Sequence, residues 1–150
     1  MDQNLKPSDK ATVLARIDPD AAGAGTVSTI YVKASDFHQL LAIVQAGDLG
    51  ASATVDAKLR QATDSSGTGV KDITGATITQ LTQAGTDSDK IVLINLDPNK
   101  LDVEGGFDYV KLDITVAVAA SEIAGLLLGF EPRYGVAAHI AAVDEVLSVF

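Results

Sequence analysis

Two stretches of the chain alternate apolar and polar residues with a period of two, which restricts the folds open to it. In residues 51–61, ASATVDAKLRQ, the odd positions from 51 to 59 carry Ala, Val or Leu and the even positions carry polar side chains. Residues 107–119, FDYVKLDITVAVA, repeat the pattern with the opposite parity. Successive side chains of a strand point to opposite faces, so both stretches are predicted to be β-strands with one core face and one solvent face.

Six further segments have the composition of strands, and turn-forming residues separate them. The intervening GDLG, TQAGTDSD, DPNK and VEGG contain the Gly, Asp, Asn and Pro that turns use. About eight strands at short spacing, with no long helix between them, predict an all-β fold: an antiparallel β-sandwich, jelly-roll-like. Three of the six, 38–46, 90–96 and 122–130, are apolar on both faces and are predicted to be central in their sheets. The six segments are 12–18, 26–34, 38–46, 76–82, 90–96 and 122–130.

Three connections are predicted between these strands. Residues 18–25, DPDAAGAG, are expected to form a flexible loop, and a short helix could begin at Ser35. Residues 62–75, ATDSSGTGVKDITG, are predicted to be a long connection on the rim of the sandwich. The segment contains Gly67 and Gly69, but it has neither the third glycine and following helix of a dinucleotide-binding motif nor the lysine of a phosphate-binding loop. These glycines are therefore expected to supply positive φ in turns.

The two ends of the chain differ from its middle. Residues 1–11 are polar and are predicted to form an N-terminal arm, ahead of a sandwich domain at 12–136. Residues 137–150 form a C-terminal extension with apolar residues at helix-like spacing, although the segment also alternates weakly as extended chain. It could pack on its own domain or dock on a neighbouring subunit. The candidate subunit-contact residues are Ile140, Val143, Leu147 and Phe150.

Charge and composition exclude several classes of function. The chain carries 20 acidic and 11 basic residues, a net charge of -9, and its basic residues are scattered singly, so no nucleic-acid partner is expected. Without cysteine there is no disulfide, thiolate metal site or Cys nucleophile. The start of the chain does not have the pattern of a secretory signal, and Ser121 and Glu122 interrupt the longest apolar run. No membrane partner is expected.

The sequence specifies no active site. The two histidines, His38 and His139, stand in unrelated contexts, and no G-x-S-x-G motif is present. Residues 18–29 match an EF-hand loop only in part, and Asp87 and Asp89 could at most hold a calcium ion weakly. The sequence does not exclude that two of the 20 acidic residues come together as an acid–base pair. No catalytic residue, metal ligand, cofactor or small-molecule substrate is predicted, and the protein is expected not to be an enzyme.

Three segments of the chain resemble a known group of viral proteins. They are FHQLLAIVQAGDLGASATVDAKLRQATDSSGTGVKDITGATITQLTQAG (37–85), INLDPNKLDVEGGFDYVKLDITV (94–116) and PRYGVA (132–137). In most of residues 26–137 the chain resembles small virion proteins encoded in the head modules of tailed bacteriophages and prophages. The order ATVDAKLRQATD, GTG, KDI and TITQLTQAG is the most specific part of the resemblance.

The resemblance implies a structural protein of the virion, made in the cytoplasm of the bacterial host. The expected role is that of a capsid decoration or cement protein that binds the major capsid protein and copies of itself, commonly as a homotrimer. A head–tail junction or tail component would have the same sequence qualities.

A different class of function stays open beside the virion role, namely a jelly-roll module that binds carbohydrate or a cell surface. Such a module would need an exposed platform of aromatic side chains. The residues that would have to form it are Tyr31, Phe37, Phe107, Tyr109, Phe130 and Tyr134.

Overall fold

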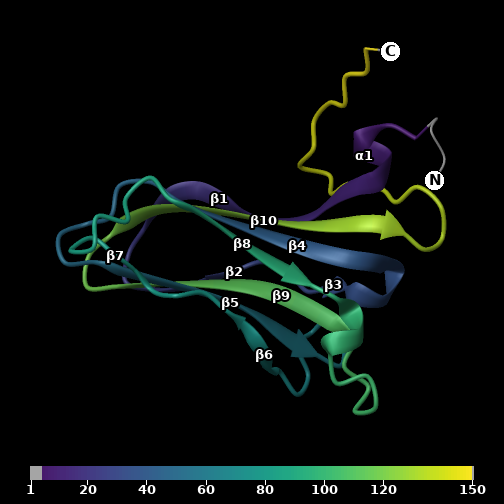
Figure 1. Cartoon of the computed structure of the whole chain (residues 1–150), viewed down its shortest axis with the longest axis horizontal. Coiled ribbons are helices and arrows are strands. Elements are labelled where there is room, and N and C mark those ends of the chain that lie inside the picture. Colours follow the sequence, from purple (N-terminus) through teal and green to yellow (C-terminus); the bar gives the residue numbers. More distant parts are fainter. Residues whose placement is uncertain (1–4, 150) are drawn as a thin grey trace.

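Two antiparallel β-sheets are stacked face to face in the computed structural model, which describes residues 5–149 (Figure 1). In spatial order, sheet A consists of β1 (Ala11–Ala22), β10 (Ser121–Pro132), β4 (Phe37–Ala46) and β8 (Ile91–Leu96). Sheet B consists of β2 (Gly25–Ser28), β9 (Tyr109–Ala117), β5 (Thr54–Ala62) and β6 (Lys71–Thr77), with β3 (Val32–Lys33) on β9 and β7 (Leu81–Thr82) on β5. The helical segments are α1 (Pro7–Lys10) and two 3-10 turns, η1 (Ala34–Asp36) and η2 (Pro98–Lys100).

The strands pair in the nested order of a jelly roll. β1 pairs with β10, β2 with β9, β4 with β8 and β5 with β6, and every pairing is antiparallel. This order makes the four-stranded sheet A and the six-stranded sheet B from interleaved Greek keys. The prediction of an all-β, jelly-roll-like sandwich is confirmed. The described chain has ten strands because segment 26–34 divides into β2 and β3, and segment 76–82 covers the end of β6 and all of β7.

The core lies between the sheets and follows the alternation seen in the sequence. Val55, Ala57 and Leu59 of β5 are buried, and so are the even positions of β9 from Val110 to Val116. Val118 was expected to continue that inner face but is 71% exposed. The expectation is wrong there because β9 ends at Ala117 and Val118 adopts a left-handed backbone with φ 75.

Two inward-facing glycines of β10 leave space for larger core side chains, one from the neighbouring strand β4 and one from β9 of the other sheet. A Cβ built on Gly129 would lie 2.5 Å from Cδ1 of the Phe37 ring, and one on Gly125 would lie 2.9 Å from Cδ2 of Leu112. Phe37 and Leu112 are both buried. The missing side chains of β10 thus leave the space that these two larger side chains occupy.

Two predicted connections contain strands. Residues 71–75 belong to β6, so the connection after β5 spans only 63–70 and the prediction of a loop over 62–75 is wrong. β1 likewise continues through Pro19 to Ala22, where a flexible loop over 18–25 was expected. A register shift between Ile17 and Asp20 leaves Pro19 out of the pairing with β10, and β1 is at the edge of its sheet, so the strand can contain a proline.

Two smaller expectations also fail. β8 was expected to be central because it is apolar on both faces, but it forms an edge of sheet A. The helix expected at Ser35 is only the three-residue turn η1, since the inward-facing Phe37 already begins β4.

Candidate interaction surfaces

The outer face of sheet A carries a continuous group of apolar side chains. The pairing register aligns Leu93 of β8 with Ile43 of β4, and Ile43 with Leu126 of β10. In the neighbouring row, Leu41 lies beside Leu128. We call this group the apolar face. It consists of Leu41, Ile43, Ile91, Leu93, Leu126 and Leu128.

The apolar face is partly open to solvent. Ile91, Leu93 and Leu126 are 61%, 56% and 38% exposed, and the other members are half-buried. The segments that are apolar on both faces were predicted to be central in their sheets, and a central position does not cover the outer face. In the structure only the inner face of sheet A is covered by a second sheet. A contiguous exposed apolar patch is typical of a surface that contacts another macromolecule.

The outer face of sheet B has the opposite chemistry. Asp72 accepts hydrogen bonds from Nζ of Lys58 at 2.9 Å and from Nε of Arg60 at 2.8 Å. The hydrogen bond from Lys58 and the positive charges of Lys58 and Arg60 lower the pKa of the Asp72 carboxyl. The charged side chains of this face therefore pair with one another and are compatible with contact with water. The apolar face of sheet A has no charged groups that would favour such contact.

A buried carboxylate anchors the same charged face. Asp113 is 4% exposed and accepts a hydrogen bond from Oγ of Ser28 at 2.6 Å, while Nζ of Lys111 lies 3.0 Å from its Oδ1. The Lys111 side chain is itself only 17% exposed. Asp113 therefore connects Ser28 of β2 with Lys111 of β9 at a site that little water reaches.

Replacing Asp113 with alanine is expected to lower the free energy of unfolding by about 3 kcal/mol, because Lys111 would lose its partner at a largely buried site. Asp18→Ala is the matched control, since Asp18 pairs with Arg16 while 65% exposed, and a surface pair contributes about 0–1 kcal/mol. Urea denaturation of both variants measures the difference. Equal losses would show that the Asp113 pair is no stronger than a surface pair.

The C-terminal extension is attached to the free edge of β1. The N–H of Ile140 donates to the Val13 carbonyl at 3.0 Å, and the N–H of Val13 donates to Nδ1 of His139 at 3.0 Å. His139 thus acts as a structural acceptor. The described part of the extension contains no helix, and it projects from the end of sheet A beside α1 (Figure 1).

The structure places the four subunit-contact candidates differently. Ile140 and Val143 are half-buried near β1, whereas Leu147 is 80% exposed. Phe150 lies outside the described residues. Val146 and Val149 are exposed next to Leu147, so the last described residues present apolar side chains to solvent. Whether these residues contact another subunit stays a prediction.

The loop over 63–70 is held by turn chemistry. The carboxylate of Asp64 accepts the N–H groups of Ser66 at 2.9 Å and of Thr68 at 3.0 Å. A hydrogen bond from the Thr68 side chain, followed by those from the backbone N–H groups, lowers the pKa of Asp64. Gly67 and Gly69 have φ of +87 and +67, as predicted. The Asp64 carboxylate is therefore used within the loop.

Of the two residues considered as weak calcium ligands, Asp87 uses its carboxylate within its own loop. The carboxylate of Asp87 accepts the N–H of Thr82 at 2.9 Å, and Asp89 donates its own N–H to Gly47 at 3.1 Å. Within residues 5–149, no three His, Asp or Glu side chains gather in a way that could hold a metal ion. His38 lies exposed at the start of β4.

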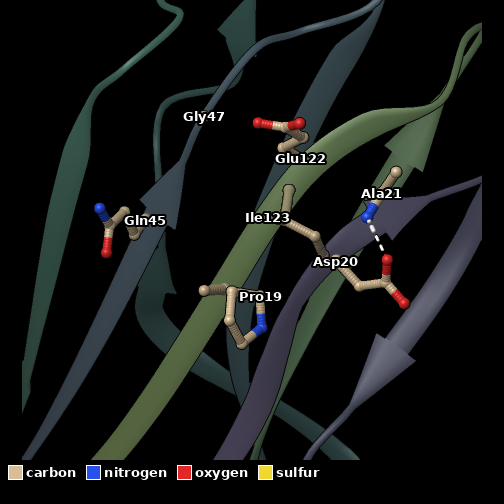
Figure 2. A pocket seen from close by; sticks show the side chains of 8 residues that line it. Pro19, Asp20, Ala21, Gln45, Gly47, Glu122 and Ile123 are labelled. Carbon is tan, nitrogen blue, oxygen red and sulfur yellow. Dashed lines mark hydrogen bonds between the residues drawn. The ribbon is translucent and has the colours of Figure 1, made fainter.

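A shallow hollow of about 450 Å³ lies where β1, β10 and the end of β4 meet (Figure 2). Asp20 and Glu122 supply its carboxylates. The Asp20 carboxylate accepts the N–H of Ala21 at 2.8 Å and turns toward that backbone instead of toward Glu122. The hollow thus does not bring an acid–base pair together.

The six aromatic side chains do not form one platform. Phe37 is buried in the core, Tyr134 is 83% exposed beyond β10, and Phe130 belongs to sheet A. Tyr31 and Phe107 instead lie against the 63–70 loop, since Cβ atoms on Gly67 and Gly69 would meet their rings. A single sugar-binding surface built from all six residues is therefore wrong.

No helix in the described part of the chain is long and apolar enough to cross a membrane.

No protein-family model and no curated protein sequence matches the chain. Among solved structures, it is similar to a chain of the cowpea mosaic virus empty virus-like particle, with a TM-score of 0.48, 11% identity and coverage of 100% of this chain and 92% of that one. A chain of the naturally occurring empty particles of the same virus has a TM-score of 0.46, 12% identity and coverages of 97% and 96%. A chain of broad bean stain virus has a TM-score of 0.47 and 11% identity, with coverage of 98% of this chain and 96% of that one. Similarity at this level identifies neither a family nor a function.

Proposed function

We propose that the chain is a non-enzymatic structural protein of a tailed-phage virion, which decorates or cements the head by binding the major capsid protein and copies of itself. The observation that carries the proposal is the apolar face of sheet A, which stands opposite the charged outer face of sheet B. Burial of the apolar face against a shell would remove it from water, while the charged face would stay in solvent. The resemblance of residues 26–137 to small virion proteins supports the same role.

The C-terminal extension supplies the second contact in this proposal. It is held to β1 through Ile140 and then exposes Val146, Leu147 and Val149. An extended apolar segment of this kind can dock on a neighbour with little change in its own domain. Many copies on one lattice would add the weak contacts of each copy together.

Deletion of residues 137–150 is expected to leave the domain folded and to weaken head binding at least about tenfold. The measurement is co-sedimentation with heads purified from the phage or prophage that encodes the chain, together with thermal unfolding. The double variant Val146→Ser and Leu147→Ser is the conservative counterpart, because both side chains are exposed and leave the His139 and Ile140 contacts intact.

Two results would contradict this account. If the shortened chain no longer folds, the extension belongs to the domain's own core. If the full chain does not sediment with heads at all, the decoration role is wrong, and a reconstruction that places it at the tail or head–tail junction would replace that role.

A further inference from the structure

The β8 edge of sheet A presents backbone groups that no neighbouring strand uses. The N–H of Ala46 donates to the Lys90 carbonyl at 2.9 Å, and hydrogen-bonded and non-hydrogen-bonded pairs alternate along an antiparallel ladder. β8 therefore directs the N–H and C=O groups of Ile91, Leu93 and Asn95 away from β4. Within the described chain, β4 is the only strand that pairs with β8.

Within residues 5–149, none of the usual devices protects this edge. Edge strands are commonly guarded by charged residues, proline, a bulge or a covering segment. β8 has the sequence IVLINL, without charge or proline, and its register with β4 runs from Leu40 to Gln45 without a shift. Ile91 and Leu93 are 61% and 56% exposed. Such an edge can accept another strand directly.

We propose that β8 pairs antiparallel with β8 of a second copy about a two-fold axis, which joins two sheets A into one eight-stranded sheet. A slip of one residue would exchange inner and outer faces, so paired residues must have the same parity. The register with Leu93 opposite Leu93 of the second copy meets this condition. It also pairs all three free positions, because Ile91 then lies opposite Asn95.

Charge favours a second copy as the occupant of this edge. At a net charge of -9, copies repel one another except where a surface lacks acidic side chains, and β8 lacks them. Lys90 precedes β8 and Asp97 follows it. In this register Lys90 of each copy lies opposite Leu96 of the other, with Asp97 as the next residue, and Asp97 of each copy lies opposite Asp89 of the other. The preceding Asp89 has φ 59, which turns it out of the line of the strand.

The paired edge also extends the apolar face. Leu93 of one copy would contact Leu93 of the other on the outer side, so the two apolar faces would become continuous across the axis. A strand-edge contact is smaller than a standard interface of about 1,600 Å². We therefore expect a dissociation constant of about 10 µM in the absence of other viral proteins. This inference goes beyond the virion role and does not depend on it.

The first test is the mass of the full chain in solution, measured by size-exclusion chromatography with light scattering from about 1 to 500 µM. The expected mass is that of two 15.5 kDa chains at the upper concentrations. Leu93→Lys would place two like charges opposite each other and is expected to raise the dissociation constant at least about tenfold. Leu126→Lys is the control, since Leu126 lies on the same outer face but on the central strand β10.

A cysteine pair tests the register, because the chain has no native cysteine. Opposed Cα atoms of a hydrogen-bonded pair are about 5.5 Å apart, which is within disulfide range. Leu93→Cys is therefore expected to form a disulfide-linked dimer under mild oxidation. In Ile91→Cys the two cysteines would be four residues out of register, about 14 Å apart, and should not be linked. Circular dichroism verifies that the variants are folded.

The outcomes separate the alternatives. A monomer at every concentration, or a trimer of the full chain, would overturn the proposal. If both lysine variants lost the dimer, the whole apolar face would be the interface and the proposal would be overturned. If neither variant lost the dimer, the proposal would be overturned as well. Cross-linking of both cysteine variants, or of neither, would overturn the register and with it the two-fold pairing. Failure of head binding would leave this result unchanged.

Discussion

Replacement of Leu112 with alanine is expected to lower the free energy of unfolding by about 2–5 kcal/mol. Leu112 is fully buried in β9 and lies opposite Leu59 of β5, and its Cδ2 fills the space beside Gly125. Removal of the side chain would leave a cavity between the two sheets that their paired backbones cannot close. In a chain of this size the loss corresponds to a fall in Tm of about 10 °C.

Leu126→Ala is the matched control for this cavity. Leu126 has the same side chain, but it is 38% exposed on the outer face of sheet A. Its replacement is expected to cost less than about 1 kcal/mol, because it leaves no enclosed cavity. Chemical denaturation of both variants provides the comparison. If the two losses were equal, either the core would not lie between the sheets as described or the apolar face would already be covered in the isolated protein.

Replacement of Gly129 with alanine is expected to cost about 3 kcal/mol, although only one methyl group is added. The new Cβ would lie 2.5–2.7 Å from three ring atoms of Phe37, whose side chain is 4% exposed and has little space to move. Gly23→Ala is the control, because a Cβ there has no atom within 4 Å. It should leave the stability nearly unchanged.

A double-mutant cycle assigns the cause of the Gly129 effect. In a Phe37→Leu background the smaller side chain should make room for the methyl group added by Gly129→Ala, so the cost of that group should fall by at least about 1 kcal/mol. Additive losses would mean that Gly129 is needed for a reason other than the contact with the Phe37 ring.

The alternation of residue types was sufficient to predict which side chains form much of the core. A period of two assigns Val55, Leu59 and Leu112 to inner faces whatever the order of the strands, because adjacent side chains of a strand must point in opposite directions. Short spacing and the lack of helical segments then favoured an antiparallel sandwich. Boundaries were less predictable: β6 begins at Lys71 inside a segment whose glycines and hydroxyls favour turns, and the ladder with β5 decides its conformation.

The candidate surface could not be predicted in the same way. Segments 38–46, 90–96 and 122–130 are apolar on both faces. The same pattern occurs in strands that are buried on both faces and in strands that expose one apolar face to solvent. The sequence of β8 contains no information on whether a strand lies on each side of it. That depends on pairings between residues far apart in the chain, such as Leu41 with Asn95.

By itself, the sequence determined the class of the protein: an all-β, acidic chain without cysteine, whose alternating strands each assign one face to a core. Only the tertiary structure decided which apolar residues remain in contact with water. The jelly-roll order places β8 at an edge. Within the described residues neither outer face of the sandwich is covered by a further sheet, because two sheets can cover only each other's inner faces, so the apolar outer face of sheet A stays in contact with water.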